Sequence, residues 1–257
     1  MLMLFVSAVA LALGVMPLGS AQAAGRNGFA VRIAFPMTFN SDWTSYLGNT
    51  SNTSYNASEN AFGVNNVSHL SLVGAANIGD GSVFTHAIIT SVLRYNGILY
   101  FGSWDGYEYA VDAHSYHLLW KQFLGIDTAP AAQGCYPNGI GVSSNGAIDN
   151  GVLFVGGGDG NLYALNTANK GAVVWKTQIA TPPNEYLWGS PVVGNGHVYM
   201  GTASLGDCPL IQAKLVMLDE ATGTLLATHY TVDQTNPNDT GDSIWSKPVL
   251  DPITGSV

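Results

Sequence analysis

Two tryptophans and two cations have the side-chain chemistry of a ligand site. Trp188 opens the phrase Trp188-Gly-Ser-Pro-Val-Val193, and Trp245 opens the similar phrase Trp245-Ser-Lys-Pro-Val-Leu250. An indole face can stack on a planar ring, and cations such as Arg94 and Lys247 can polarise carbonyl oxygens. The alternative for both tryptophans is packing between structural elements, and Arg94 can equally be an exposed cation in a turn.

Motifs of several other chemistries are absent from the sequence. It contains no hydrolase elbow, Walker loop or dinucleotide fingerprint, and Gly156-Gly-Gly-Asp-Gly160 bends a predicted hairpin without opening a helix. His114 and His117 have a metal-like spacing, but they fall in a predicted turn. The Ser, His and Asp residues show no spacing that indicates a catalytic triad. No metal ligands can therefore be assigned from these patterns.

The elements that must position these residues are copies of one repeat. Gly102-Ser-Trp-Asp-Gly-Tyr-Glu-Tyr-Ala-Val-Asp112 returns as Gly156-Gly-Gly-Asp-Gly-Asn-Leu-Tyr-Ala-Leu-Asn166, and a looser copy ends in Leu215-Val-Met-Leu-Asp219. The closing residues of the three copies are spaced by 54 and then 53 residues. A fixed period of this size is typical of stacked supersecondary units.

Each copy is predicted to form four short strands. In the second copy, Val152-Leu-Phe-Val155 and Leu162-Tyr-Ala-Leu165 flank the turn pair Asp159-Gly160. Val173-Val-Trp-Lys-Thr-Gln-Ile179 is the expected outer strand, and residues 142–148 are the expected inner strand. Four strands per repeat of this length are typical of a β-propeller blade. The alternatives are a sandwich of short strands, which need not repeat its sequence, and a WD-type propeller, whose repeat is shorter.

The repeat resembles that of pyrroloquinoline-quinone (PQQ)-type propellers. Tyr109-Ala-Val-Asp112 is followed by Trp120, and Tyr163-Ala-Leu-Asn166 is followed by Trp175. In such propellers this tryptophan packs between neighbouring blades. The third copy keeps Asp219 but has Ala227 or Thr228 where the tryptophan should fall, so we expect a looser interface there.

The resemblance extends over most of the chain after about residue 41. The chain is similar to quinoprotein alcohol dehydrogenases and polyvinyl-alcohol-dehydrogenase-like propellers. This resemblance implies an all-β propeller of four-stranded blades. We expect a partial propeller over 42–257, with repeats near 85–124, 142–179 and 190–231 and a truncated one at 245–257. Residues 42–48 and 65–72 look like the leading segment of such proteins, which usually donates an outer strand to the last blade. Closed propellers have about four to eight blades, so we expect this chain to be the N-terminal part of a longer protein.

The resemblance implies a site on the propeller axis, reached by the loops that lead into the inner strands. These loops are predicted at 79–85, 125–141, 181–189 and 232–244. Trp188, Trp245, Lys247 and Arg94 are the candidate PQQ-binding residues near them, and Asp242 is the one carboxylate nominated as catalytic base. Calcium is the implied metal, although no ligand set for it can be assigned. The adjacent Cys-Cys pair of quinoprotein alcohol dehydrogenases and a Cys-x-x-Cys-His haem motif are both absent.

Two functions follow from the resemblance. The first is a secreted PQQ-dependent dehydrogenase that oxidises an alcohol or polymer hydroxyl and passes electrons to an acceptor. The second is a non-catalytic propeller scaffold that binds protein or glycan through its rim. The net charge of −9 opposes nucleic-acid binding, which requires basic patches.

The N-terminus and the cysteines both indicate export. Residues 1–23 have the apolar run and small-residue cleavage site of a signal peptide, and 24–41 form a linker. We therefore expect a periplasmic or extracellular protein; the alternative is an uncleaved membrane anchor. Cys135 and Cys208 are predicted on the same rim, one blade apart, and form a disulfide in the preferred interpretation. Two free thiols are the alternative.

Overall fold

A computed structural model describes residues 42–59, 61–72, 74–76, 78, 87–128, 139–204, 206 and 209–257. The predicted signal peptide at 1–23, the linker at 24–41, Cys135 and Cys208 lie outside these described residues. In the part that is described, no helix is both long and apolar enough to span a bilayer.

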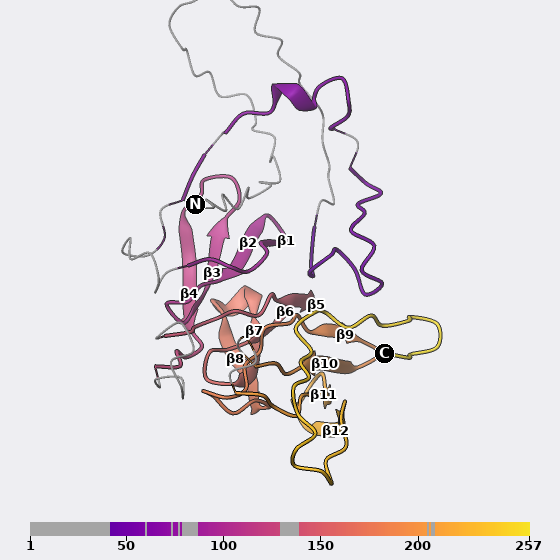
Figure 1. Ribbon diagram of the computed structural model, residues 1–257. Helices are drawn as coiled ribbons and strands as arrows, with labels where there is room; N and C mark the ends of the chain where they lie inside the picture. Colours follow the sequence, from indigo (N-terminus) through magenta and orange to yellow (C-terminus); the bar gives the residue numbers. More distant parts are fainter. Residues whose placement is uncertain are drawn as a thin grey trace, which may run out of the picture.

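Three antiparallel four-stranded sheets follow one another along the chain (Figure 1). Blade 1 contains β1 (Leu93–Tyr95), β2 (Ile98–Gly102), β3 (Tyr107–Asp112) and β4 (Leu118–Phe123). Blade 2 contains β5 (Ala147–Asp149), β6 (Val152–Gly156), β7 (Asn161–Asn166) and β8 (Ala172–Gln178). Blade 3 contains β9 (Val192–Gly194), β10 (His197–Gly201), β11 (Lys214–Asp219) and β12 (Leu225–Tyr230). Two short 3-10 helices, η1 (Val67–His69) and η2 (Thr167–Asn169), complete the elements of the described residues. The predicted all-β propeller of four-stranded blades is confirmed.

The hairpin between the second and third strands is built in the same way in blades 1 and 2. Asp159 accepts hydrogen bonds from the Asn161 backbone N–H at 3.1 Å and from the Tyr163 hydroxyl at 2.7 Å. Asp105 makes the equivalent contacts with Tyr107 and Tyr109. The glycine that follows each aspartate has a positive φ, which explains why the repeat requires Asp-Gly.

Tryptophans from the outer strands join each blade to the next. The Trp120 ring lies against Gly171 and the Trp175 ring against Gly223, where in each case an added Cβ would come within 2.6 Å of the indole. Trp175 also donates its indole N–H to the Glu220 carbonyl at 2.9 Å. In blade 3 the residue at the equivalent register is Ala227, opposite Met217. The packing expected for the repeated tryptophan is therefore observed at two interfaces. In blade 3, Ala227 takes the place of the tryptophan.

Apolar residues of neighbouring blades form two interfacial cores. The first lies between blades 1 and 2 and includes Leu93, Tyr100, Ala110, Trp120, Leu153, Val155, Tyr163 and Leu165. The second lies between blades 2 and 3 and includes Phe154, Ala164, Trp175, Val198, Met200, Val216 and Leu218. Each sheet thus buries a face against its neighbour, which fixes the positions of the turns that carry the site.

Residues 42–52, which we call the axial segment, pair with the inner strands. Trp43 forms an antiparallel bridge with Arg94 of β1, and Ser45 forms one with Ala147 of β5. The Leu250 N–H donates to the Thr50 carbonyl at 3.0 Å, so the C-terminal segment also contacts the axial segment. The expectation of an outer strand donated to the last blade does not hold for this part of the leading segment. The inner strands have unpaired backbone edges, and the axial segment satisfies part of them.

Candidate functional site

A cavity of about 690 Å³ lies where turns of the three blades meet the C-terminal segment. We call it the tryptophan cavity. Its indoles come from the β2–β3 hairpin, the connection into β9 and the C-terminal segment. Its described lining consists of Ile89, Trp104, Ser143, Asn145, Trp188, Ser204, Gly206, Ser243 and Trp245. The structure thus brings the two tryptophans selected from the sequence, Trp188 and Trp245, to one cavity.

Two of the three indoles contact each other, and the third is open to solvent. The rings of Trp104 and Trp188 meet edge to face, with centroids 6.3 Å apart and an angle of 67°. Trp104 donates its indole N–H to the Ser143 hydroxyl at 2.9 Å, which holds the ring in place. Trp245 is 73% exposed. A large exposed indole at a cavity mouth is free to take a ligand on its face.

Trp104 was missed by sequence reasoning, which treated it as a hairpin residue. A signal for it existed. In a four-stranded blade the hairpin between the second and third strands emerges on the same face as the connection into the next inner strand. Trp104 lies in the first of these turns and Ser143 in the second, and they are hydrogen-bonded.

The polar groups of the tryptophan cavity are neutral. Ser143, Ser204 and Ser243 contribute hydroxyls and Asn145 contributes an amide, while none of the described lining residues is charged. Asn145 accepts a hydrogen bond from the Ser91 backbone N–H, and Ser243 accepts one from Ser204 at 3.3 Å. These contacts orient the lining without introducing a cation or a carboxylate.

The two candidate cations do not line the tryptophan cavity. Arg94 forms an ion pair with Asp42 of the axial segment, with its guanidinium nitrogen 3.1 Å from the carboxylate oxygen. Asp42 also accepts the Asn96 backbone N–H at 3.1 Å. Arg94 therefore ties β1 to the axial segment.

Lys247 is buried and also bonds to the axial segment. Its ammonium donates to the Ser45 hydroxyl at 3.0 Å, the Tyr46 carbonyl at 3.0 Å and the Asn49 carbonyl at 2.6 Å. Burial lowers the pKa of Lys247 to about 8. The residue lines a second, smaller cavity of about 230 Å³ between the axial segment and strands β5 and β9. The ammonium donates three hydrogen bonds to the axial segment, so Lys247 acts here as a structural strut that holds this segment in place.

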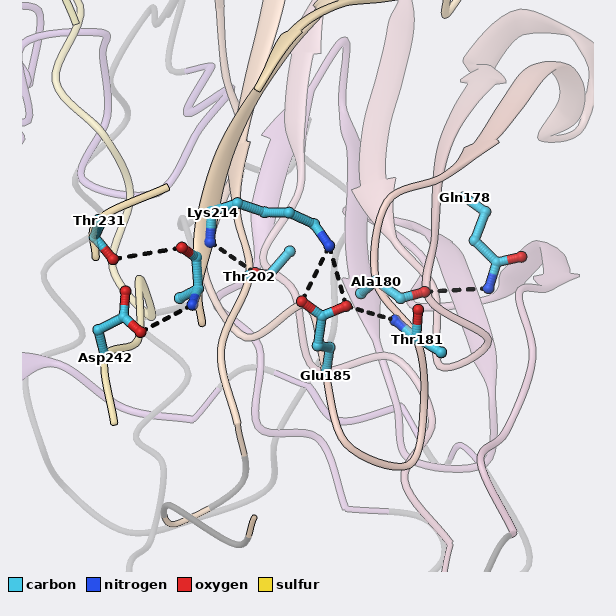
Figure 2. Close-up of polar contacts among 9 residues, drawn as sticks. Gln178, Ala180, Thr181, Glu185, Thr202, Lys214, Thr231 and Asp242 are labelled. Atoms are coloured by element: carbon cyan, nitrogen blue, oxygen red, sulfur yellow. Dashed lines mark hydrogen bonds and ion pairs between the residues drawn. The ribbon is translucent and has the colours of Figure 1, made fainter. Parts of the chain in front are cut away.

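Asp242, the nominated base, lies next in sequence to Ser243 of the cavity lining. One carboxylate oxygen accepts the Ala213 backbone N–H at 2.9 Å (Figure 2). The other is buried and has no hydrogen-bond partner among the described residues. One oxygen of Asp242 thus holds the backbone of Ala213, while the other is buried without a partner among the described residues.

An ion pair anchors the connection that carries Trp188. Lys214 on β11 donates to both carboxylate oxygens of Glu185, at 3.0 and 3.1 Å (Figure 2). Glu185 in turn accepts the Thr181 backbone N–H at 3.1 Å. Both side chains of the pair are mostly buried, at 18% and 14% exposure. The pair therefore fixes the loop from Thr181 to Trp188 against blade 3.

Glu108 on β3 is a further buried carboxyl that the sequence reading did not single out. It is 2% exposed, and one of its oxygens has no hydrogen-bond partner among the described residues. Burial raises the pKa of this carboxyl well above its ordinary value. The Glu108 carboxyl lies near Gly102, and Gly102 also packs against Val142. Val142 is next in sequence to Ser143 of the cavity lining.

The three four-stranded sheets and the tryptophans that pack between them define a propeller of the quinoprotein type. A family model described as outer membrane protein assembly factor BamB matches residues 105–247. This match covers more than half of the chain, and the chain belongs to this family of PQQ-type repeat propellers. Curated protein sequences contain no match to the chain.

Solved structures show the same fold. The quinohemoprotein alcohol dehydrogenase of Comamonas testosteroni aligns with a TM-score of 0.66 and 21% identity, over 82% of this chain and 33% of that one. A europium-containing methanol dehydrogenase aligns with a TM-score of 0.60 and 24% identity, over 75% and 32%. Quinohemoprotein alcohol dehydrogenase ADHIIG of Pseudomonas putida HK5 aligns with a TM-score of 0.50 and 25% identity, over 58% and 21%. The chain therefore spans a third or less of the length of these enzymes.

The tryptophan cavity fits one part of PQQ, the cofactor that the resemblance of the repeat implies. Three indoles offer faces and edges to a planar quinone ring, and the hydroxyls and amide can bond its oxygens. The described lining supplies no cation for the carboxylates of PQQ. Among the described residues no group of three His, Cys, Asp or Glu could hold a metal ion.

Proposed function

We propose that this chain is part of an exported quinone-dependent dehydrogenase that oxidises an alcohol or a polymer hydroxyl. The observation that supports the proposal is the tryptophan cavity, in which Trp104, Trp188 and Trp245 converge from separate turns. Relatives of the same fold include alcohol and methanol dehydrogenases. Export to the periplasm or the exterior is part of the proposal, as is an external electron acceptor.

In this proposal the three indoles hold the ring of PQQ and exclude water from its faces. An alcohol loses one proton and one hydride on oxidation, and a bound quinone would supply the acceptor for the hydride, which carries both electrons. Asp242 is the proposed base, and its unpartnered oxygen would accept the hydroxyl proton of the alcohol. Arg94 and Lys247 were candidates for contact with the quinone; their bonds to the axial segment instead support a role in holding the inner strands.

The experiment that tests this function is dye-linked alcohol oxidation by the full-length protein loaded with PQQ and calcium. Turnover that depends on PQQ is expected in the wild type. Asp242→Asn, which keeps the acceptor for the Ala213 N–H, should lower kcat by a factor of at least about 100 if Asp242 is the base. Asp251→Asn, in an exposed turn, is the control. A well-folded, PQQ-loaded protein without turnover on any alcohol would refute the enzymatic proposal.

A second candidate is a non-catalytic propeller that binds protein or glycan. The neutral lining of the tryptophan cavity favours it, because the described residues lack the cations that an anionic cofactor requires. The family match to an assembly factor also supports it. A folded protein that does not bind PQQ but retains a macromolecular ligand would favour this candidate.

A further inference from the structure

The lining of the tryptophan cavity has the composition of a site for a neutral, hydroxyl-rich molecule. All polar side chains among its described residues are hydroxyls or amides, which both donate and accept hydrogen bonds. The hydroxyls of a sugar have the same dual character. Ligands with carboxylates or ammonium groups would lose hydration in such a cavity without gaining a charged partner.

The aromatic residues add the second feature of such a site. Trp245 stands at the cavity with 73% of its surface exposed, and Trp104 and Trp188 form an edge-to-face pair in the same lining. The C–H groups of a sugar ring carry a small positive charge and stack favourably on the negative face of an indole. An indole that is open to solvent can take such a ring without displacing a packed neighbour.

The charge of the chain acts in the same direction. With eight basic and 17 acidic residues, its net charge is −9, which disfavours the approach of polyanions. The two cations closest to the site in sequence, Arg94 and Lys247, are engaged with the axial segment. They offer no compensation for a negative ligand inside the cavity.

We propose that the tryptophan cavity binds a neutral glycan chain, with a sugar ring stacked on Trp245 and its hydroxyls bonded to the serines and Asn145. This proposal deepens the second candidate function, a non-catalytic propeller that binds glycan, and rests on the lining of the tryptophan cavity.

The test is binding of defined oligosaccharides to the quinone-free full-length protein, measured by calorimetry and tryptophan fluorescence. Neutral maltohexaose and cellohexaose are compared with an anionic oligogalacturonate. We expect at least one neutral oligosaccharide to bind and quench or shift the fluorescence, and the anionic one to bind at least about tenfold more weakly. Trp245→Ala should weaken neutral binding by at least about tenfold, equivalent to about 1.4 kcal/mol.

Matched variants separate a site from a loss of folding. Tyr55→Ala removes another exposed aromatic outside the cavity and should leave binding unchanged. Ser143→Ala and Ser243→Ala should each weaken binding while leaving the thermal transition in place. Equal binding of neutral and anionic chains, binding unaffected by Trp245→Ala, or no glycan binding by the folded protein would overturn the inference. Because the binding assay contains no quinone, it tests the glycan site independently of the dehydrogenase proposal. Glycan binding together with no turnover in the PQQ-loaded assay would refute the dehydrogenase but would support the glycan site.

Discussion

At the scale of single residues, equivalent positions of the repeat carry different side chains in the three blades and make different contacts. Trp120 and Trp175 dock on a glycine of the following blade, whereas Ala227 stands at that register in blade 3. The hairpin position following Ser103 carries Trp104, which turns to the cavity, while Gly158 precedes the equivalent aspartate of blade 2. Blades 1 and 2 therefore share the docking contact but differ in the turn residue that can reach the cavity.

Trp175→Ala should cost about 3–5 kcal/mol of unfolding free energy, because it removes a buried indole and leaves a cavity. It also leaves the Glu220 carbonyl without its indole partner. Urea denaturation of the purified protein measures the change. Trp245→Ala removes the same side chain from an exposed site and serves as control, with little expected effect on stability. A similar cost for both variants would contradict the docking role of Trp175.

Glu220 should make stability depend on pH near neutrality. The pKa of Glu220 is raised to about 7, mainly by burial. A hydrogen bond to Asp149 and the negative charge of Asp149 raise it further. A carboxyl whose folded-state pKa is raised contributes stability below its unfolded value of about 4.3, and this contribution is lost as the pH rises through 7. The Tm of the wild type should therefore fall between pH 5 and pH 8 by more than the Tm of Glu220→Gln.

The matched variant for this titration is Glu59→Gln, which neutralises an exposed carboxylate away from the blade interface. Its Tm should follow the wild type across the same range. Parallel curves for wild type and Glu220→Gln would show that Glu220 does not titrate in this window.

At the scale of elements, the axial segment connects parts of the chain that are distant in sequence. It bridges β1 and β5, and it receives Lys247 and Leu250 from the C-terminal segment. Trp245 precedes Lys247 by two residues, so the strut at Lys247 also limits where Trp245 can lie. Scaffold and site are coupled through this one segment.

Lys247→Met should release the axial segment. The change removes three hydrogen bonds and should cost on the order of 3 kcal/mol, about one for each bond. Denaturation measures the loss, and limited proteolysis should show faster cleavage within residues 42–52. Lys176→Met, on an exposed part of β8, is the control for removal of a charge. Unchanged protection of the axial segment in Lys247→Met would argue against the strut.

At the scale of the whole molecule, the architecture follows from a local pattern and the site does not. The strands could be predicted because each turn and alternation lies within one repeat of the sequence. Trp188 and Trp245 could be selected because they open similar phrases. Trp104 was missed, and the partners of Lys247 could not be foreseen, because Ser45 lies 202 residues away and outside the repeat. Long-range contacts of a non-repeating segment leave no periodic trace in the sequence.

The most direct test of the proposed quinone site is a titration of the full-length protein with PQQ, followed by quinone absorbance and quenching of tryptophan fluorescence. Saturable binding of one quinone is predicted, weakened at least about tenfold by Trp188→Ala and by Trp245→Ala and unchanged by Tyr55→Ala. Absence of binding by the folded protein, or equal binding by all these variants, would contradict the assignment of the tryptophan cavity as the quinone site.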